Sequence, residues 1–178
     1  MSEVHTFSKR FLIGPALLAV IAAALVWATP GSQFTTTVLQ RSISETPIEI
    51  RIHPPVPVLD ENGEDRNAGT KYWTDPPALS DILVQQVTAP PGGYSGWHSH
   101  PGTGLVAVRA GVVAIYSGDD PTCTPKYVAA GGAFIEEAGH VHMVRNEGTV
   151  PYEAYSTFVL PAGIPSRTDE PNPGHCPF

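Results

Sequence analysis

After residue 30 the chain offers only short runs of β-branched and apolar residues, and none keeps a helical apolar period over eleven positions. Turn sequences such as Gly-Asp-Asp-Pro, Ala-Gly-Gly and Asn-Glu-Gly separate these runs. The 178 residues include 17 glycines and 19 prolines, and both residue types break helices. The pattern excludes a helical bundle or coiled coil. It predicts an all-β domain of about eight to ten short strands, hence a sandwich or a barrel.

The expected strands are the runs richest in β-branched and aromatic residues. They are 34–39, 48–52, 82–88, 105–108, 112–116, 133–135, 141–144 and 152–160. Residues 54–80 differ, because five prolines, an Asn-Gly pair and several charges predict a long surface loop or insertion there. One domain at residues 29–178 accommodates all of these segments.

Residues 1–28 have a composition that recurs nowhere else in the chain. Lys9 and Arg10 precede an uncharged apolar run at 11–28. As a helix this run would rise about 27 Å, just short of a hydrocarbon core of about 30 Å. A cleaved signal peptide fits this pattern, and a retained N-terminal membrane anchor at 11–28 fits nearly as well. Both predict an N-terminal hydrophobic helix and an extracytoplasmic domain, either secreted or anchored to the membrane.

The charge balance bears on the partners of the domain. There are 17 acidic side chains against 10 Lys and Arg, the formal net charge is −7, and the basic residues are scattered. Because no basic stripe exists to displace counterions from phosphates, we expect no binding to nucleic acid. We expect a small-molecule ligand or substrate instead, and a homodimer is left open.

The two cysteines support export. Cys123 lies in the turn-rich DDPTCTP and Cys176 in the C-terminal PGHCPF. An even count in an exported protein predicts one disulfide, which would pin the C-terminal tail to the domain. The alternative is two unrelated free thiols. Neither cysteine has a Cys-x-x-Cys partner, so a cysteine metal site is not expected.

Four histidines form two His-x-His pairs, His98 with His100 and His140 with His142. In a strand, residues i and i+2 point to the same face, about 6.6–6.8 Å apart along the backbone. Each pair can therefore direct two imidazoles toward one point, and neighbouring strands would bring three or four ring nitrogens together. Imidazole suits zinc, iron, copper and nickel. The pattern predicts a metal site.

The stretches around these pairs resemble the two motifs of the cupin family. Positions of the first motif match at Gly92, His98, His100 and Gly111. Positions of the second motif match at Gly131, Gly139, His142 and Asn146, and Glu137 replaces the family's proline. The chain also resembles a subgroup of small exported bacterial cupins that share the DDPTCTP and GHCPF-like ends. The resemblance implies a single-domain jelly-roll β-barrel at 29–178, with its motif-bearing core at 82–160.

The chain departs from the family at one metal ligand. The family's glutamate should stand at position 104, with position 105 as the alternative, and this sequence has Gly104 and Leu105 there. The resemblance then implies a three-histidine site of His98, His100 and His142, with His140 as a further ligand in the alternative. Gly104 is expected to leave a coordination position open. A site of neutral ligands keeps the full charge of one divalent transition metal ion (iron, manganese, nickel, copper or zinc) and should attract anions.

The resemblance leads to two functions of different kinds. The first is an exported metal-dependent enzyme that carries out an oxygenase-type or isomerase-type reaction on a small anionic molecule. Glu137, beside Glu136, is its candidate general base, although a solvated turn would place acidic residues there as well. The alternative is a non-catalytic module that binds a small ligand or a metal. A barrel that lost its metal together with the glutamate belongs to this alternative.

Overall fold

A computed structural model describes residues 29–46, 48–52, 70–73 and 79–178. These residues contain twelve strands. The strands are β1 (Thr35–Ile43), β2 (Glu49–Ile52), β3 (Thr70–Trp73), β4 (Ser80–Ala89), β5 (His98–Ser99), β6 (Thr103–Ala110), β7 (Val112–Ser117), β8 (Lys126–Ala129), β9 (Ala133–Glu136), β10 (His142–Arg145), β11 (Tyr152–Pro161) and β12 (Thr168–Asp169). Within these ranges no helix has the length and apolar character needed to span a bilayer. The N-terminal helix predicted at 1–28 lies outside the described residues.

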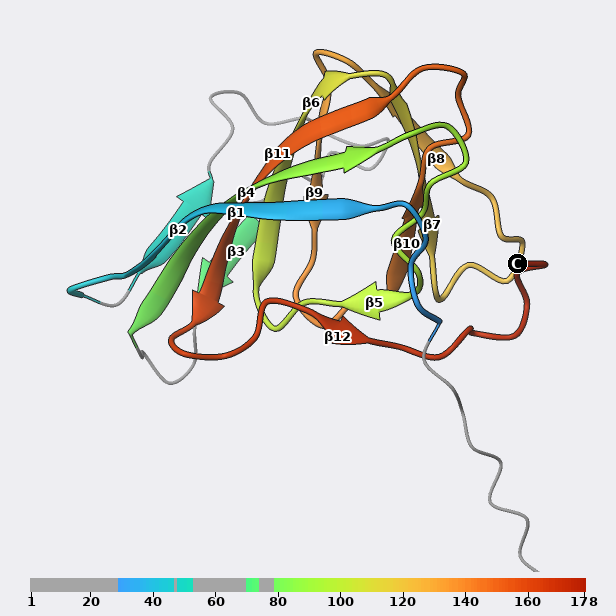
Figure 1. The fold of residues 1–178 in the computed structure, drawn as a ribbon. Helices are drawn as coiled ribbons and strands as arrows, with labels where there is room; N and C mark the ends of the chain where they lie inside the picture. The colour runs from blue at the N-terminus through green and yellow to red at the C-terminus, as the bar shows by residue number, and fades with distance from the viewer. Residues whose placement is uncertain (1–28, 47, 53–69, 74–78) are drawn as a thin grey trace, which may run out of the picture.

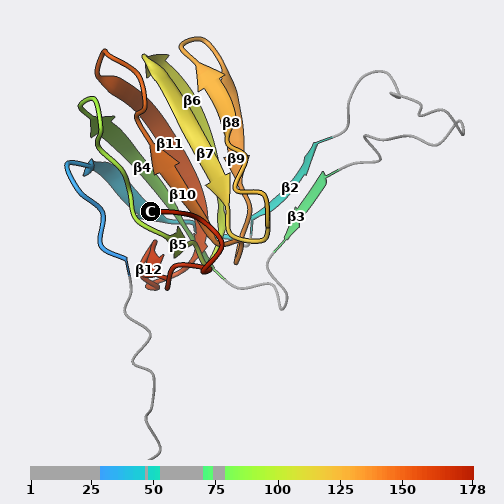
Figure 2. The same cartoon turned by 90° about the vertical axis from the view of Figure 1, so that its right-hand side faces the viewer.

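The strands form the two facing sheets of a jelly roll, as expected for an all-β barrel (Figures 1 and 2). One sheet has the order β1-β4-β11-β6-β9 and the other the order β12-β5-β10-β7-β8. Neighbours in the sheets are antiparallel and mostly non-consecutive in the chain, so long-range contacts define the fold. The pair β2–β3 is a separate two-stranded sheet, beside the other two in Figure 2.

The strand sequences explain which side chains fill the space between the sheets. Along β11, every second residue from Tyr152 to Leu160 is buried and the residues between them are more exposed, which is the period of two that a half-buried strand requires. The main cluster of buried residues joins β4, β6, β7, β8, β9, β10 and β11. Phe158, Leu83 and Leu160 form a smaller cluster, each with 1% or less exposed. Burying such a side chain contributes about 1.5–3 kcal/mol.

The eight predicted runs correspond to β1, β2, β4, β6, β7, β9, β10 and β11, with ends that shift by a few residues. The other four strands are additions to the prediction. β3 lies within the segment expected to be a loop or insertion at 54–80, where it pairs with β2. β5 and β12 have two residues each, so their partner strands and not local sequence determine them. β8 pairs with β7.

The predicted disulfide is present between Cys123 and Cys176, whose Cα atoms are 5.4 Å apart. Cys176 is buried in a cluster that includes Trp97 and Met143. Phe178 packs against the ring of Tyr116 with ring centroids 4.9 Å apart. The C-terminal tail is thus fixed to the sheet that carries β7 and β10. The same sheet contains His98 in β5 and His142 in β10.

Candidate metal centre

Three of the histidines that the sequence indicates converge in the interior of the domain. His98 in β5 and His142 in β10 are direct cross-strand partners, and His100 lies just beyond β5. Each of the three is buried, with 5% or less of its surface exposed. One potential ligand atom from each lies within 4.8 Å of those of the other two. A single ion can therefore contact all three imidazoles.

Main-chain carbonyls orient the three rings. Each ring places its Nδ1 at hydrogen-bond distance from a carbonyl oxygen, which can only accept, so Nδ1 carries the proton and donates. The pairs are His98 with Gly96 at 2.9 Å, His100 with Ser166 at 2.6 Å, and His142 with His140 at 3.0 Å. In the neutral ring this arrangement puts the lone pair on Nε2, which is the tautomer that a metal ligand needs.

Burial favours the neutral form of two of the three rings. Burial lowers the pKa of His98, and the neighbouring His142 adds to the effect. Burial also lowers the pKa of His100, although Glu136 opposes it. The Nε2 atoms of His100 and His142 are buried without a hydrogen-bond partner in the described residues. Unpartnered imidazole nitrogens that converge are the donor set of a transition-metal site, so these residues fit the predicted ion.

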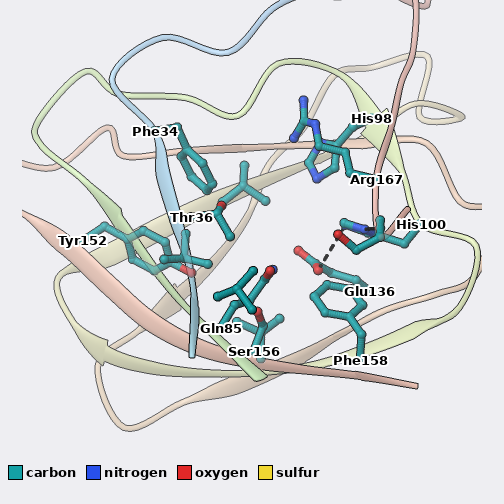
Figure 3. Close-up of a pocket in the computed structure, with 15 residues that line it drawn as sticks. Phe34, Thr36, Gln85, His98, His100, Glu136, Tyr152, Ser156, Phe158 and Arg167 are labelled. Carbon is teal, nitrogen blue, oxygen red and sulfur yellow. Dashed lines mark hydrogen bonds and ion pairs between the residues drawn. The ribbon is translucent and has the colours of Figure 1, made fainter. Parts of the chain in front are cut away.

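A carboxylate faces these nitrogens. The side chain of Glu136, at the end of β9, is 10% exposed and points into the pocket toward His100 (Figure 3). Its Oε2 lies 3.4 Å from Nε2 of His100, and its Oε1 lies 3.4 Å from Nε2 of His142. Burial would raise the pKa of Glu136, but His142, His100 and Arg167 together hold that pKa below its usual range. The group is thus a buried carboxylate.

His140 does not join the cluster. Its ring is partly exposed, and its Nε2 lies 2.8 Å from Oγ of Ser117 and 3.3 Å from Oδ1 of Asp119. β10 begins only at His142, so the strand alternation that would place both rings on one face does not extend to residue 140. His140 contributes its carbonyl oxygen, which orients His142, and not its imidazole.

Glu137, the candidate base, is exposed in the turn after β9, whereas Glu136 is directed inward. The reason is alternation, since Glu136 shares the inward face of β9 with the buried Phe134. Extending the predicted strand 133–135 by one residue would identify Glu136 as the residue in the site. The candidate carboxylate is therefore Glu136 and not Glu137.

The space beside Gly104, which is expected to leave a coordination position open, is occupied by an aromatic ring. A Cβ atom at this position would overlap the ring of Phe158, well inside the van der Waals limit. Phe158 is the cross-strand partner of Gly104, and its ring packs against that of His100 with centroids 4.5 Å apart. The absent side chain makes room for an aromatic ring instead of a metal ligand.

A cavity of about 190 Å³ adjoins the cluster. Its polar lining includes Gln85, Ser156 and Arg167 together with two of the histidines and Glu136 (Figure 3). The hydroxyl of Ser156 is buried and has no hydrogen-bond partner in the described part of the chain. The guanidinium of Arg167 donates to the carbonyl of Ser95 at 2.6 Å and to Asp169. No sequence signal points to Gln85, Ser156 or Arg167, because each reaches the pocket from a different segment.

The comparison with protein families gives one match. The family model described as a cupin domain matches residues 85–158, which include His98, His100 and His142. Residues 85–158 are a cupin domain. No curated protein sequence matches the chain.

Several solved structures resemble this cupin-containing chain. They include the polyketide cyclase RemF from Streptomyces resistomycificus, at 11% identity and a TM-score of 0.48 over 82% of this chain and 79% of that one. A conserved protein with a double-stranded β-helix domain from Klebsiella pneumoniae matches at 25% identity and a TM-score of 0.42, over 50% and 75% of the two chains. Recombinant oxalate oxidase in complex with glycolate matches at 22% identity and a TM-score of 0.44. That match spans 49% of this chain and 45% of the oxidase chain.

Proposed function

We propose that this cupin is a metal-dependent enzyme that carries out an oxygenase-type or isomerase-type reaction on a small anionic molecule. The observation that carries the proposal is the group of three buried imidazoles, each oriented through Nδ1 and facing a common point beside a cavity. A divalent transition metal held there would supply Lewis acidity or redox chemistry to a bound substrate. Burying an imidazole nitrogen without a hydrogen-bond partner lowers the stability of the fold unless that nitrogen binds a ligand.

The cavity limits the substrate class. A volume of about 190 Å³ is smaller than the roughly 300 Å³ or more typical of drug-sized ligands, which favours a molecule of few heavy atoms. The guanidinium of Arg167 would bind an anionic group such as a carboxylate. The hydroxyl of Ser156 and the amide of Gln85 would donate hydrogen bonds to the rest of the molecule and orient it beside the metal.

The domain is proposed to act outside the cytoplasm. The disulfide between Cys123 and Cys176 is typical of proteins from oxidising compartments. Secretion or anchoring by residues 11–28 would bring the domain there.

The test is turnover by metal-reconstituted protein. Separate samples loaded with iron, manganese, nickel or copper are incubated with a panel of small hydroxy-, keto- and dicarboxylates. Oxygen consumption is followed with an electrode, and substrate loss by NMR. We expect one metal to support turnover of at least one compound. Arg167→Gln should raise KM at least about tenfold through loss of the charged contact. Arg109→Gln, which removes an exposed arginine, is the matched control and should leave KM unchanged.

Two results would overturn the enzymatic proposal. The first is stoichiometric metal without turnover of any compound in the panel. That outcome favours the non-catalytic binding module, and small carboxylates should then still raise the thermal midpoint of the metal-bound protein. The second is turnover that Arg167→Gln and Arg109→Gln alter equally, which would remove Arg167 from the site.

A further inference from the structure

We propose that Glu136 is the fourth ligand of the metal, and that it supplies from β9 the carboxylate that Gly104 cannot supply from β6. The proposal rests on the proposed metal-dependent function and names a residue that completes its site. It concerns a donor set of three imidazoles and one carboxylate, held by His98, His100, His142 and Glu136.

Strand register brings Glu136 next to position 104. Gly104 is the direct cross-strand partner of Glu136 on one side and of Phe158 on the other. Directly opposed residues point to the same face, with Cβ atoms about 4.5–5.5 Å apart. The carboxylate is therefore displaced by one strand from position 104, a distance that the long side chain of a glutamate can cover. Phe158 fills the volume left at Gly104. The glutamate that the family has at this position is thus replaced in volume by Phe158 and in charge by Glu136.

The polar atoms of these residues point toward one another. The two oxygens of Glu136 face two different imidazoles, each at 3.4 Å from Nε2. Neither His100 nor His142 makes a hydrogen bond through that nitrogen in the described residues, and both rings donate through Nδ1 to carbonyls. Where Nε2 of these rings carries a lone pair, it repels the carboxylate oxygen that faces it. A divalent cation between them makes every one of these contacts attractive.

The charge of the carboxylate also favours a bound ion. One carboxylate reduces the formal charge of the site from about +2 to about +1, so the ion remains attractive to an anionic substrate while its own burial costs less. The mixed nitrogen and oxygen set also suits iron and manganese better than a purely imidazole set does.

The experiment measures metal affinity without any catalytic assay. The parent, Glu136→Gln and Glu137→Gln are stripped with a chelator and titrated with Co²⁺ in competition with a chromophoric chelator. Visible absorption of the Co²⁺ forms reports the ligand set. Glu137→Gln removes the same charge from the neighbouring exposed residue and is the matched control. We expect Glu136→Gln to weaken binding at least about 100-fold and to change the spectrum, and Glu137→Gln to stay within about threefold of the parent.

The metal-free proteins give a second readout. The amide introduced by Glu136→Gln can donate to a free Nε2 lone pair, so the metal-free variant should melt no lower than the metal-free parent. A variant that fails to fold or melts lower would show that Glu136 serves an ion pair with protonated histidine, which overturns the inference. A variant that binds Co²⁺ as the parent does, with the same spectrum, also overturns it and leaves the three-histidine site standing. If the parent binds no Co²⁺, this result contradicts the proposed metal-dependent function itself.

Discussion

Gly104 shows how one residue constrains the site. A side chain at this position would meet the ring of Phe158, which in turn packs on His100. Phe158 is only 1% exposed, so its ring is held among the atoms around it. Any side chain at position 104 therefore has to displace an aromatic ring that lies against His100.

This contact leads to a prediction for Gly104→Ala. Because the added methyl overpacks the contact with Phe158, we expect the free energy of unfolding to fall by about 1–3 kcal/mol. Metal affinity should fall as well, since Phe158 shifts against His100. Urea unfolding measures the first effect and Co²⁺ titration the second. Adding Phe158→Leu should recover part of the lost stability in a double-mutant cycle.

Gly148→Ala is the control, because a Cβ at that exposed position would meet only Oδ1 of Asn146 at 3.3 Å. Equal stability losses for the variants at positions 104 and 148 would contradict the role of the Phe158 contact.

At the scale of strands, sequence periodicity can identify the elements that carry enough alternating or β-branched residues to be recognised alone. β4 and β11 are of this kind, with ten residues each and alternating burial. The histidine-bearing strand β5 is different, because its two residues are strand-like only through pairing with β10 and β12. The two His-x-His pairs still identify the three clustered histidines, because their spacing can be recognised without predicting β5. Glu136 could not be predicted as a ligand, because its approach depends on the register of β9 against β6.

The disulfide belongs to this scale too, because it fixes the C-terminal segment to the turn between β7 and β8. It closes a loop of 53 residues, for which the chain-entropy model gives about 4 kcal/mol of stabilisation. We expect the double variant Cys123→Ser/Cys176→Ser to lose stability of that order in urea unfolding. The loss should equal the effect of a reducing agent on the parent.

A reducing agent should leave the double variant unchanged, which serves as the control. A loss of less than about 1 kcal/mol in the double variant, well below the usual range for a native disulfide, would mean that contacts such as Tyr116 with Phe178 hold the tail without the bond.

At the scale of the whole molecule, the jelly roll gathers segments that are far apart in the chain around one cavity. Gln85 comes from β4, Ser156 from β11 and Arg167 from the segment before β12. Ser166, beside Arg167, also provides the carbonyl that orients His100. Sequence patterns could predict that the barrel has an interior site, because two His-x-His pairs favour one. They could not predict the polar lining, since single serines, glutamines and arginines have no periodic or spacing signal.

The metal site itself rests on His98, His100 and His142, which are expected to hold one divalent transition metal ion. Elemental analysis measures the number of metal ions per chain. The protein is purified without chelators and then reloaded with a divalent transition metal ion. We expect about one ion per chain for the parent and for His140→Ala, whose ring contacts Ser117 instead of the site. Stoichiometric metal should be lost in His98→Ala and His142→Ala. A parent without metal after reloading, or a His142→Ala variant that binds as much as the parent, would contradict the site.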